Sequence, residues 1–577
     1  MTQDTNSFAW LSHYPEHIDW NAKLRICPLH ELLDESARRF PDNIALDFKG
    51  KLYTYKELQL KVNCFARGLH ELGIGKGSKV GLFMPNCPQF VIAFFAALKA
   101  GATVVNYNPL YSQRELEHQI KDSGTELMIT LNLTLLYPKL QEFIGTTTVE
   151  KVIVGNFPSV LPPAKAALYT LAKAKDIARI PKDHRHHSFM ELLAFPPDVA
   201  PPKIDPYNDI AVLQYTGGTT GVPKGVVLTH ANLSANVAQC QKWFYKAREG
   251  DETIMGVLPF FHVFAMTVIM NFGIASGFRI IMHPRFELKS LLDDIAKKKP
   301  ALMPGVPTMF SAIIQHKMLH KYDLTSLKMC ISGGGPLPVD VKQQFEKLTG
   351  CKLVEGYGLS ESSPVVSCNP LFAINKEGSI GQPFPGTILE VIDPDDKITP
   401  KAVGEVGEIC IRGPQVMSGY WEKPEETANV LKPLPKKASV ADWVKAKFSA
   451  SKADEKEMRL YTGDLGYMDK DGYFFIVDRL KEMIISGGYN IYPRNIEEVL
   501  YSHPDIVEAA VIGIAHPTRG QVPKAFIVKK EGSLLTADEV ETYLKERLSA
   551  YCVPHTYEFC DALPKSMIGK ILKKELK

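Results

Sequence analysis

Short apolar runs alternate with helical segments in the first half of the chain, and this alternation restricts the fold more than any other feature. Residues 80–84 (VGLFM) have the pattern of a strand, residues 88–101 (PQFVIAFFAALKAG) that of a helix, and residues 102–108 (ATVVNYN) again that of a strand. Strands that alternate with helices are typical of βαβ units. The pattern therefore predicts an α/β fold with a mainly parallel sheet.

Two later changes of pattern divide the chain, whose 577 residues are too many for one hydrophobic core. Beyond Gly378, short strands and turns predict an antiparallel β subdomain. After Asp478, strand patterns and two predicted helices (494–502 and 536–548) indicate an α+β unit. We therefore expect a large N-terminal domain, residues 1–478, of parallel αβ subdomains plus a β subdomain, and a small α+β C-terminal domain, residues 479–577.

Composition excludes some function classes. The net charge of +3 argues against a nucleic-acid protein with a broad basic surface. The ten cysteines include no CxxC pair and indicate reduced thiols in a cytoplasmic protein, and the N-terminus has no secretory pattern. Residues 254–278 lack Asp, Glu, Lys and Arg, a length that could span a bilayer. Pro259, His262 and Asn271 interrupt this stretch, so we expect a buried strand followed by a buried helix from Val263.

Two segments leave their roles open. Residues 157–190 bracket a short basic helix with prolines, and its lysines and leucines suit either contact with an anionic membrane surface or an ordinary solvated helix. Residues 431–459 are a polar, lysine-rich insertion, expected as a surface excursion with one short helix around residues 441–447.

Residues 214–227 (QYTGGTTGVPKGVV) place glycines, hydroxyls and Lys224 between two apolar strands. Glycine lets backbone N–H groups converge on an anion, while hydroxyls add donors and lysine adds charge. The composition predicts a phosphate cradle, although a flexible loop without a ligand has the same composition. Residues 332–338 (SGGGPLP) and 355–362 (EGYGLSES) are expected to end two more strands. Because ligands bind at the carboxyl ends of parallel strands, we expect the three loops to meet in one crevice.

Seven motifs occur in an order that identifies a family resemblance. They are YTGGTTGVPKG, LPFFHVF, SGGGPLP, EGYGLSES, YTGDLG, DRLKEMIISGGYNIYP and PKSMIGK. With this set the chain resembles the adenylate-forming superfamily, which includes acyl-CoA synthetases, luciferases and nonribosomal-peptide adenylation domains. The sequences NPLYSQRELEHQ and GYGLSESSPVVSCNP and the basic segment 157–190 are most similar to bacterial long-chain fatty-acid–CoA ligases.

The resemblance implies a nucleotide site. Phosphate-binding residues would be Thr216, Gly217, Gly218, Thr219, Thr220 and Lys224. Residues around the adenine, the acyl group and the α-phosphate would be Gly334, Gly335, Pro336, Glu355, Gly356, Tyr357, Gly358 and Ser360, with Tyr357 stacked on adenine. Thr216 and Glu361 would hold Mg²⁺. Asp464 would accept the ribose hydroxyls, and Arg479 would contact ribose and phosphate.

The resemblance also implies two half-reactions. Lys570, on a mobile C-terminal domain, would bridge a carboxylate and the α-phosphate during adenylation. The domain would then swing about Lys481 and present Gly487 and Gly488 to the pantetheine arm of coenzyme A. His262 would lie near the acyl site and gate the passage, and a buried histidine with a satisfied hydrogen bond is the alternative interpretation. Met266 stands where some long-chain relatives have a gating tryptophan.

The activity expected from these residues is ATP- and Mg²⁺-dependent ligation of a long-chain fatty acid to coenzyme A. A medium-chain or aryl-acid CoA ligase, a fatty-acyl-AMP ligase, a luciferase-like oxidase and a non-catalytic fatty-acid-binding protein remain alternatives. We expect a cytoplasmic protein with peripheral contact to the inner membrane face and no nucleic-acid partner. The chain length of the acid and a homodimeric state are left open by the sequence.

Overall fold

The computed structural model describes residues 8–216, 223–434, 457–486, 489–566 and 569–576. The chain forms two compact units. The large unit comprises Tyr14–Gly386 and Lys565–Lys570, and the small unit comprises the segments before Tyr14, Thr387–Pro564 and the residues from Ile571. The two compact units separate after Gly386. The expected domain boundary after Asp478 remains a prediction.

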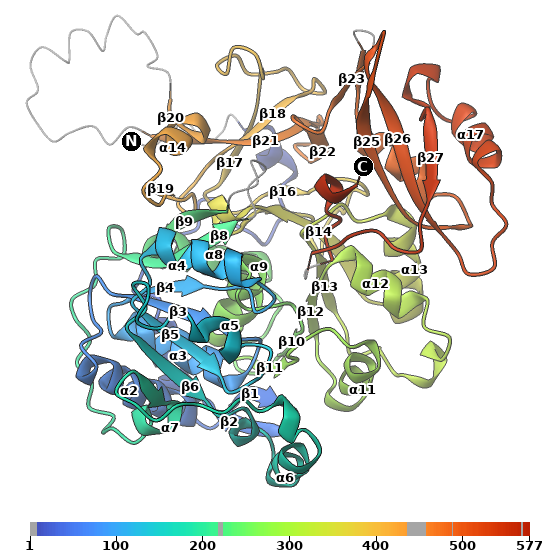
Figure 1. Ribbon diagram of the computed structural model, residues 1–577. Coiled ribbons are helices and arrows are strands. Elements are labelled where there is room, and N and C mark those ends of the chain that lie inside the picture. The colour runs from blue at the N-terminus through green and yellow to red at the C-terminus, as the bar shows by residue number, and fades with distance from the viewer. Residues whose placement is uncertain (1–7, 217–222, 435–456, 487–488, 567–568, 577) are drawn as a thin grey trace, which may run out of the picture. The chain divides into compact units, whose positions relative to one another are not determined.

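One sheet of the large unit is parallel over most of its width (Figure 1). Its order is β16 (Gln382–Pro383), β15 (Val365–Cys368), β14 (Lys352–Gly358), β13 (Met329–Ser332), β12 (Leu302–Gly305), β10 (Thr253–Gly256), β11 (Arg279–Met282), β1 (Ile44–Phe48) and β2 (Lys51–Thr54). The pairs from β14 to β1 are parallel, and antiparallel strands flank them on both sides.

A second sheet of the large unit contains the strand that enters the Gly/Thr loop. It runs β9 (Lys224–Thr229), β8 (Ile210–Thr216), β4 (Thr103–Asn106), β3 (Lys79–Phe83), β5 (Leu127–Leu131), β6 (Lys151–Gly155) and β7 (His186–Ser188). Only the β8–β9 pair of this series is antiparallel. The expected mainly parallel α/β architecture is confirmed, but the three loops expected on one sheet begin on two different sheets.

Helices cover these sheets as the sequence pattern predicts. They are α1 (Glu31–Arg39), α2 (Tyr55–Glu71), α3 (Pro88–Lys99), α4 (Gln113–Ser123), α5 (Tyr137–Gln141), α6 (Pro163–Ala172), α7 (Phe189–Leu192), α8 (His230–Trp243), α9 (Val263–Ala265), α10 (Phe272–Ala275), α11 (Leu288–Lys298), α12 (Pro307–Ile314) and α13 (Val339–Thr349). Every residue of α3 is buried, because its sequence is apolar on all sides. Among the residues described, no helix is long and apolar enough to cross a membrane.

The first sheet of the small unit is antiparallel, as the sequence predicts. It runs β17 (Ile388–Ile392), β18 (Gly407–Arg412), β21 (Met458–Met468) and β20 (Leu431–Pro433), with β22 (Phe474–Arg479) paired to β21. The short elements β19 (Gly419–Tyr420) and α14 (Pro424–Val430) lie between β18 and β20 in the sequence. Most of the insertion 431–459, with its expected helix, lies outside the described residues.

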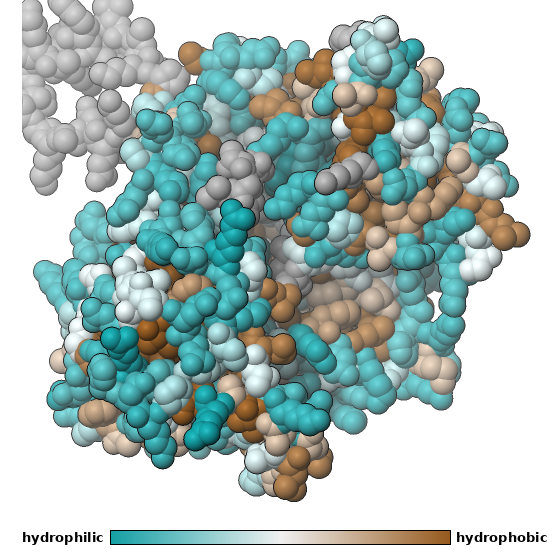
Figure 2. All heavy atoms as spheres, viewed as in Figure 1, coloured by the Kyte–Doolittle hydropathy of each residue, from teal (hydrophilic) through white to brown (hydrophobic). Residues whose placement is uncertain are grey.

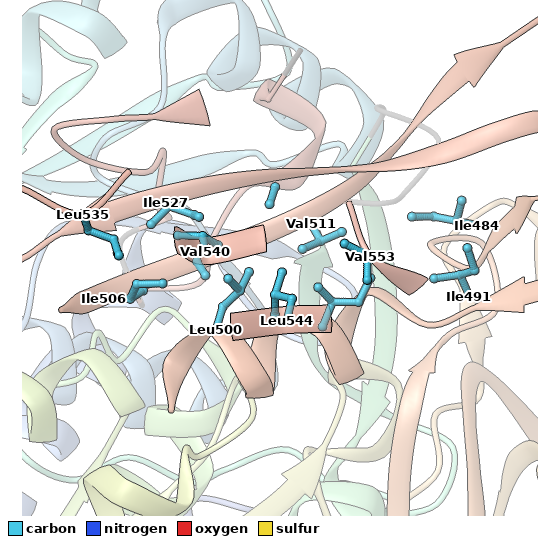
Figure 3. Close-up of a cluster of buried hydrophobic side chains, with 13 residues drawn as sticks. Ile484, Ile491, Leu500, Ile506, Val511, Ile527, Leu535, Val540, Leu544 and Val553 are labelled. Carbon is cyan, nitrogen blue, oxygen red and sulfur yellow. The ribbon is translucent and has the colours of Figure 1, made fainter. Parts of the chain in front are cut away.

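The C-terminal part of the small unit has its own sheet and core. The sheet runs β24 (Tyr489–Ile491), β23 (Ile484–Ser486), β26 (Gly520–Lys529) and β25 (Ile506–His516), with β27 (Thr556–Phe559) paired to β26. Leu500 of α16 (Pro493–Tyr501) and Leu544 of α17 (Ala537–Lys545) pack with Val511 and Ile527 of the sheet (Figure 3). The sequence predicts an α+β unit after Asp478, and its sheet, two helices and separate buried core confirm this.

Candidate active site

The β8–β9 hairpin holds both ends of the Gly/Thr loop. Thr216 pairs with Lys224 across the hairpin. Just before the loop, the Gln214 side chain donates to the Phe261 carbonyl at 3.0 Å and accepts from Asn106 Nδ2 at 3.1 Å. The base of the predicted phosphate cradle is therefore fixed within the large unit. Gly217, Gly218, Thr219 and Thr220 lie outside the described residues.

The glycine-rich segment after β13 leaves open space. Gly334 has a φ of 77°, in the left-handed region that favours glycine. A Cβ added at Gly335 would meet no atom within 4 Å, whereas one at Gly333 would lie 3.0 Å from the Phe264 ring. The backbone from Gly334 to Pro336 is therefore accessible to a ligand on one side and packed on α9 at its start.

The second glycine motif lies at the end of a strand, as the sequence predicts. Gly356 and Gly358 lie within β14, which continues beyond its parallel neighbour and pairs with the antiparallel strand β15. A Cβ at Gly358 would lie 2.0 Å from the Pro364 carbonyl oxygen. Glycine is required here by the close approach of the backbone around Pro364. The prediction that a strand ends at this motif is confirmed, because β14 ends at Gly358. Glu355 is buried in the same strand, and Tyr357 is half-buried.

A short 3₁₀ helix, η7 (Ser360–Ser362), connects the two sheets of the site. It carries Ser360 and Glu361 away from β14 and packs against β9, the strand that begins at Lys224. The Thr267 hydroxyl donates to the Ser363 carbonyl at 2.6 Å and holds the following turn. The phosphate and metal residues expected from two loops therefore come together, although their strands belong to different sheets.

His262 lies at the start of α9, where its Nδ1 accepts from the Phe264 N–H at 3.3 Å. Burial, together with the positive charge of Lys570, lowers the pKa of His262 to about 4. The imidazole is therefore neutral near pH 7. The hydrogen bond with the Phe264 N–H is what a buried structural histidine would make. The nearby charge of Lys570 is what a histidine beside the acyl site would experience.

Lys570 belongs to the large unit through the segment Lys565–Lys570. The Ser566 N–H donates to the Lys570 carbonyl at 2.8 Å and closes a tight loop. Gly569 in this loop has a φ of 72°, and an added Cβ would lie 2.3 Å from Thr308 Oγ1 at the start of α12. The motif glycine is therefore required both by its backbone angle and by its contact with α12. Thr308 belongs to no motif, and no sequence signal could have marked it.

The helix after His262 has an unexpected irregularity. The predicted buried helix from Val263 is present, but Met266–Asn271 forms a π-helical turn between α9 and α10. Met266 is buried, and Asn106 Nδ2 lies 3.4 Å from its sulfur. The amide oxygen and nitrogen of Asn271 are buried with no hydrogen-bond partner among the described residues. Such π-helical turns are frequent at functional sites.

The predicted ribose residues are neighbours in the small unit. Asp464 of β21 pairs with Arg479 of β22, and Arg479 Nε lies 3.2 Å from Asp464 Oδ1. Lys481 follows in a turn where the Glu482 N–H donates to the Arg479 carbonyl at 3.0 Å. Gly487 and Gly488 lie outside the described residues.

The acidic groups of the site are sparse. Among the described residues, no cluster of three or more His, Cys, Asp or Glu side chains could hold a metal ion. Glu361 is a single half-buried carboxylate, on the 3₁₀ helix that packs against β9. One carboxylate with a hydroxyl suits Mg²⁺ that is bound mainly through nucleotide phosphates.

Comparisons with known proteins agree with this arrangement. The AMP-binding enzyme family matches residues 33–421, and the AMP-binding enzyme C-terminal domain matches residues 495–570. A long-chain-fatty-acid–CoA ligase of Bacillus subtilis (strain 168) is 43% identical over 98% of this chain and 97% of its own length. One from Escherichia coli O157:H7 is 37% identical over the same shares.

Solved structures with the same fold include ATP-bound MatB from Rhodopseudomonas palustris, which is 25% identical with a TM-score of 0.77 over 95% of this chain and 98% of its own. Another is the o-succinylbenzoate CoA synthetase of Bacillus subtilis in complex with its acyl-adenylate intermediate, which is 25% identical with a TM-score of 0.73 over 96% of this chain and 99% of its own. Because the first family match spans more than half of the sequence and relatives above 30% identity span nearly all of it, the chain belongs to the AMP-binding enzyme family.

Proposed function

We propose that this protein is an ATP-dependent ligase that joins a long-chain fatty acid to coenzyme A through an acyl-adenylate. The full-length similarity to long-chain-fatty-acid–CoA ligases supports the substrate class. The observation that carries the chemistry is the Lys570 loop, which lies in one compact unit with Lys224, Glu361 and His262. Lys570 is close enough to His262 for its charge to lower the pKa of the imidazole.

In the first half-reaction, an oxygen of the fatty-acid carboxylate attacks the α-phosphorus of ATP. The bond from that phosphorus to the bridging oxygen of pyrophosphate breaks, and pyrophosphate leaves. Lys570 lies between the two anionic reactants, offsets their repulsion and stabilises the charge that develops. Thr216, Lys224 and the loop between them hold the departing phosphates, and Ser360 binds the α-phosphate.

Glu361 and Thr216 are the residues proposed to hold Mg²⁺. When bound, the ion would neutralise charge on the phosphate oxygens. Tyr357, Gly334, Gly335 and Pro336 surround the adenine and the acyl group, and Asp464 with Arg479 binds the ribose.

In the second half-reaction, the coenzyme A thiol loses its proton to water, and the thiolate attacks the acyl carbonyl carbon. The C–S bond of the thioester forms, and AMP leaves with the electrons of the broken C–O bond. Lys570 has no part in this step and must be withdrawn. We propose that the segment after Asp478 rotates about Lys481 and brings Gly487 and Gly488 to the pantetheine arm. Such domain motions set the turnover rate of many enzymes.

We also propose peripheral contact with an anionic membrane through α6. This helix has no buried residue, and Leu168 and Leu171 are 66% and 82% exposed. Hydrophobic side chains gather at the tip of the large unit that Figure 1 labels α6 (Figure 2). The exposed basic residues Lys173, Lys175 and Arg179 follow directly in the sequence. Exposed leucines beside basic residues suit an anionic bilayer surface, where the fatty-acid substrate also partitions.

A screen of acids tests the proposed reaction. Purified protein is incubated with ATP, Mg²⁺, coenzyme A and single acids from C2 to C20 or cinnamates, and AMP and acyl-CoA are measured. We expect equal amounts of AMP and thioester, with the highest kcat/KM for long-chain acids. A preference for cinnamates or medium-chain acids would favour the aryl or medium-chain alternative. Acyl-adenylate formation without thioester would favour a fatty-acyl-AMP ligase.

A further inference from the structure

A half-buried lysine near the C-terminus bridges two carboxylates in the small unit. Lys573 begins the 3₁₀ helix η9 (Lys573–Glu575). Its Nζ lies 2.8 Å from Glu497 Oε1 and 3.2 Å from Glu482 Oε2. Burial works to lower the pKa of Lys573, but the charges of Glu497 and Glu482 outweigh it and raise the pKa. Lys573 therefore keeps its positive charge near neutral pH.

The two carboxylates belong to different parts of the small unit. Glu482 directly follows Lys481 in the turn after β22, whereas Glu497 lies in α16. Glu497 Oε1 also accepts from the Val511 N–H of β25 at 2.7 Å. Lys573 therefore connects the turn beside Lys481 to a helix and a strand that pack in the C-terminal core.

The other end of this turn has a fixed position as well. Asp478 accepts from the N–H groups of Arg479, at 2.7 Å, and of Arg494 in the first turn of α16, at 2.9 Å. Asp478 and Glu482 thus flank the segment 479–481. Asp478 binds α16 directly through the Arg494 N–H, and Glu482 is connected to Glu497 of α16 through Lys573. A carboxylate that accepts N–H groups of a helix start also interacts favourably with the helix dipole.

Lys573 also stands at the base of the loop that carries Lys570. It is the third residue after Lys570, and the Leu572 N–H donates to the Pro564 carbonyl at 2.8 Å, which closes the loop base. One side chain therefore sets the position of the loop base relative to the turn that contains Lys481.

We propose that Lys573 is a positioning residue for the adenylation half-reaction. Through its ion pairs with Glu482 and Glu497, Lys573 holds the base of the Lys570 loop to the Lys481 turn. This inference rests on the role proposed for Lys570. Lys573 contacts no substrate in this scheme, and it acts by fixing where the neighbouring loop begins. Since a misplacement of about 1 Å can lower a rate by about a hundredfold, loss of these ion pairs affects the step that needs Lys570.

The test compares Lys573→Met with Lys574→Met, because Lys574 is an exposed lysine in the same short helix. Adenylation is measured by ATP–pyrophosphate exchange with a fatty acid, and thioester formation is measured from supplied acyl-adenylate. For Lys573→Met we expect the kcat of exchange to fall at least about tenfold, while the KM for ATP and the thioester rate stay within about twofold. Lys573→Arg restores most of the exchange rate, and Lys574→Met leaves both rates unchanged.

Two further variants keep the outcomes separate. Glu482→Gln removes one ion pair at a partly exposed side chain and is expected to lower exchange selectively but less strongly, even if Lys573→Met fails to fold. Lys570→Ala is the reference, and we expect it to lose exchange and retain thioester formation. If Lys570→Ala is selective but Lys573→Met and Glu482→Gln leave exchange unchanged, or reduce both half-reactions equally, the positioning role is overturned alone. If Lys570→Ala is not selective, the proposed role of Lys570 fails, and the positioning role fails with it.

Discussion

The His262 imidazole couples the stability of the large unit to pH. Its pKa is about 4 in the folded protein, against 6.5 for an unperturbed histidine, because burial and the Lys570 charge disfavour the imidazolium. Between these values the unfolded chain binds a proton that the folded chain does not. Stability therefore falls as the pH falls from about 6.5 towards 4, and the contribution of His262 is constant above that range.

We expect His262→Asn to reduce this dependence, because asparagine can still accept the Phe264 N–H but does not titrate. Urea midpoints measured at pH 7.5, 6.0 and 5.0 should fall less for His262→Asn than for the unmodified protein. The exposed residue His320 provides a control, and His320→Asn should follow the unmodified protein. His30 and His230 are buried and also titrate at low pH, but they are the same in every variant and cancel in the comparison. Parallel curves for His262→Asn and the unmodified protein would contradict the assignment.

Individual glycines show how far sequence reasoning reaches at this scale. The motifs correctly placed Thr216 and Lys224 beside one loop, because hydroxyls and a lysine around glycines have a recognisable composition. The same reasoning correctly placed Gly358 at the end of a strand, but it did not indicate that this glycine lies close to the Pro364 carbonyl. A glycine needed for a turn and one needed for close approach of two strands look identical in a sequence.

Among the elements, α6 gives the sharpest prediction. The helix is held to the large unit by Lys165, whose Nζ donates to the Lys49 carbonyl at 2.6 Å, so its leucines remain at the surface. Burying a leucine is worth about 1.5–3 kcal/mol. We expect the double variant Leu168→Ser and Leu171→Ser to weaken binding to vesicles of anionic phospholipid at least about tenfold, even if only part of each side chain inserts.

The matched control replaces two exposed leucines elsewhere. Leu135 and Leu534 are 77% and 90% exposed, and their replacement by serine should leave vesicle binding unchanged. Co-sedimentation with vesicles containing phosphatidylglycerol, compared with vesicles of neutral lipid, measures the effect. Equal loss of binding in both double variants, or equal binding to neutral and anionic vesicles, would show that α6 has no specific part.

The π-helical turn at Met266–Asn271 marks the limit of prediction for elements. The apolar run in residues 254–278 correctly indicated a buried strand and a buried helix from Val263. Nearly every side chain of this helix is buried, so its sequence has no polar face. Without a polar face, the spacing of polar residues cannot indicate where the helix changes from α to π geometry. The strands β24 and β27 were missed for a related reason, since each has only a few residues.

At the scale of the molecule, the motif order indicated the family and both half-reactions. It did not indicate that Lys565–Lys570 would form one compact unit with residues 14–386 while the residues on either side belong to the small unit. Strand and helix patterns predict neighbours within a sheet, but they do not record which distant segment a loop such as the one at Gly569 packs against. The candidate site in the large unit therefore draws on two sheets and a C-terminal loop, which only the folded chain brings together.

Lys570 and Gly488 belong to segments that fall in different compact units. We therefore expect that one half-reaction can be lost while the other is retained. Gly488 lies outside the described residues, and the role proposed for it rests on the motif: a residue without a side chain would let the pantetheine arm pass close to the backbone. We expect Gly488→Leu to leave ATP–pyrophosphate exchange within about twofold and to lower thioester formation from supplied acyl-adenylate by about a hundredfold, because the thiol can no longer reach its attack position.

Gly75→Leu is the matched control, since a Cβ at Gly75 has no atom nearer than 3.9 Å and its backbone needs no glycine. The pattern is the reverse of that expected for Lys570→Ala, so one half-reaction serves as the internal standard for the other. Equal losses of both half-reactions in Gly488→Leu, with Gly75→Leu fully active, would show that the glycine supports the fold rather than the passage of coenzyme A.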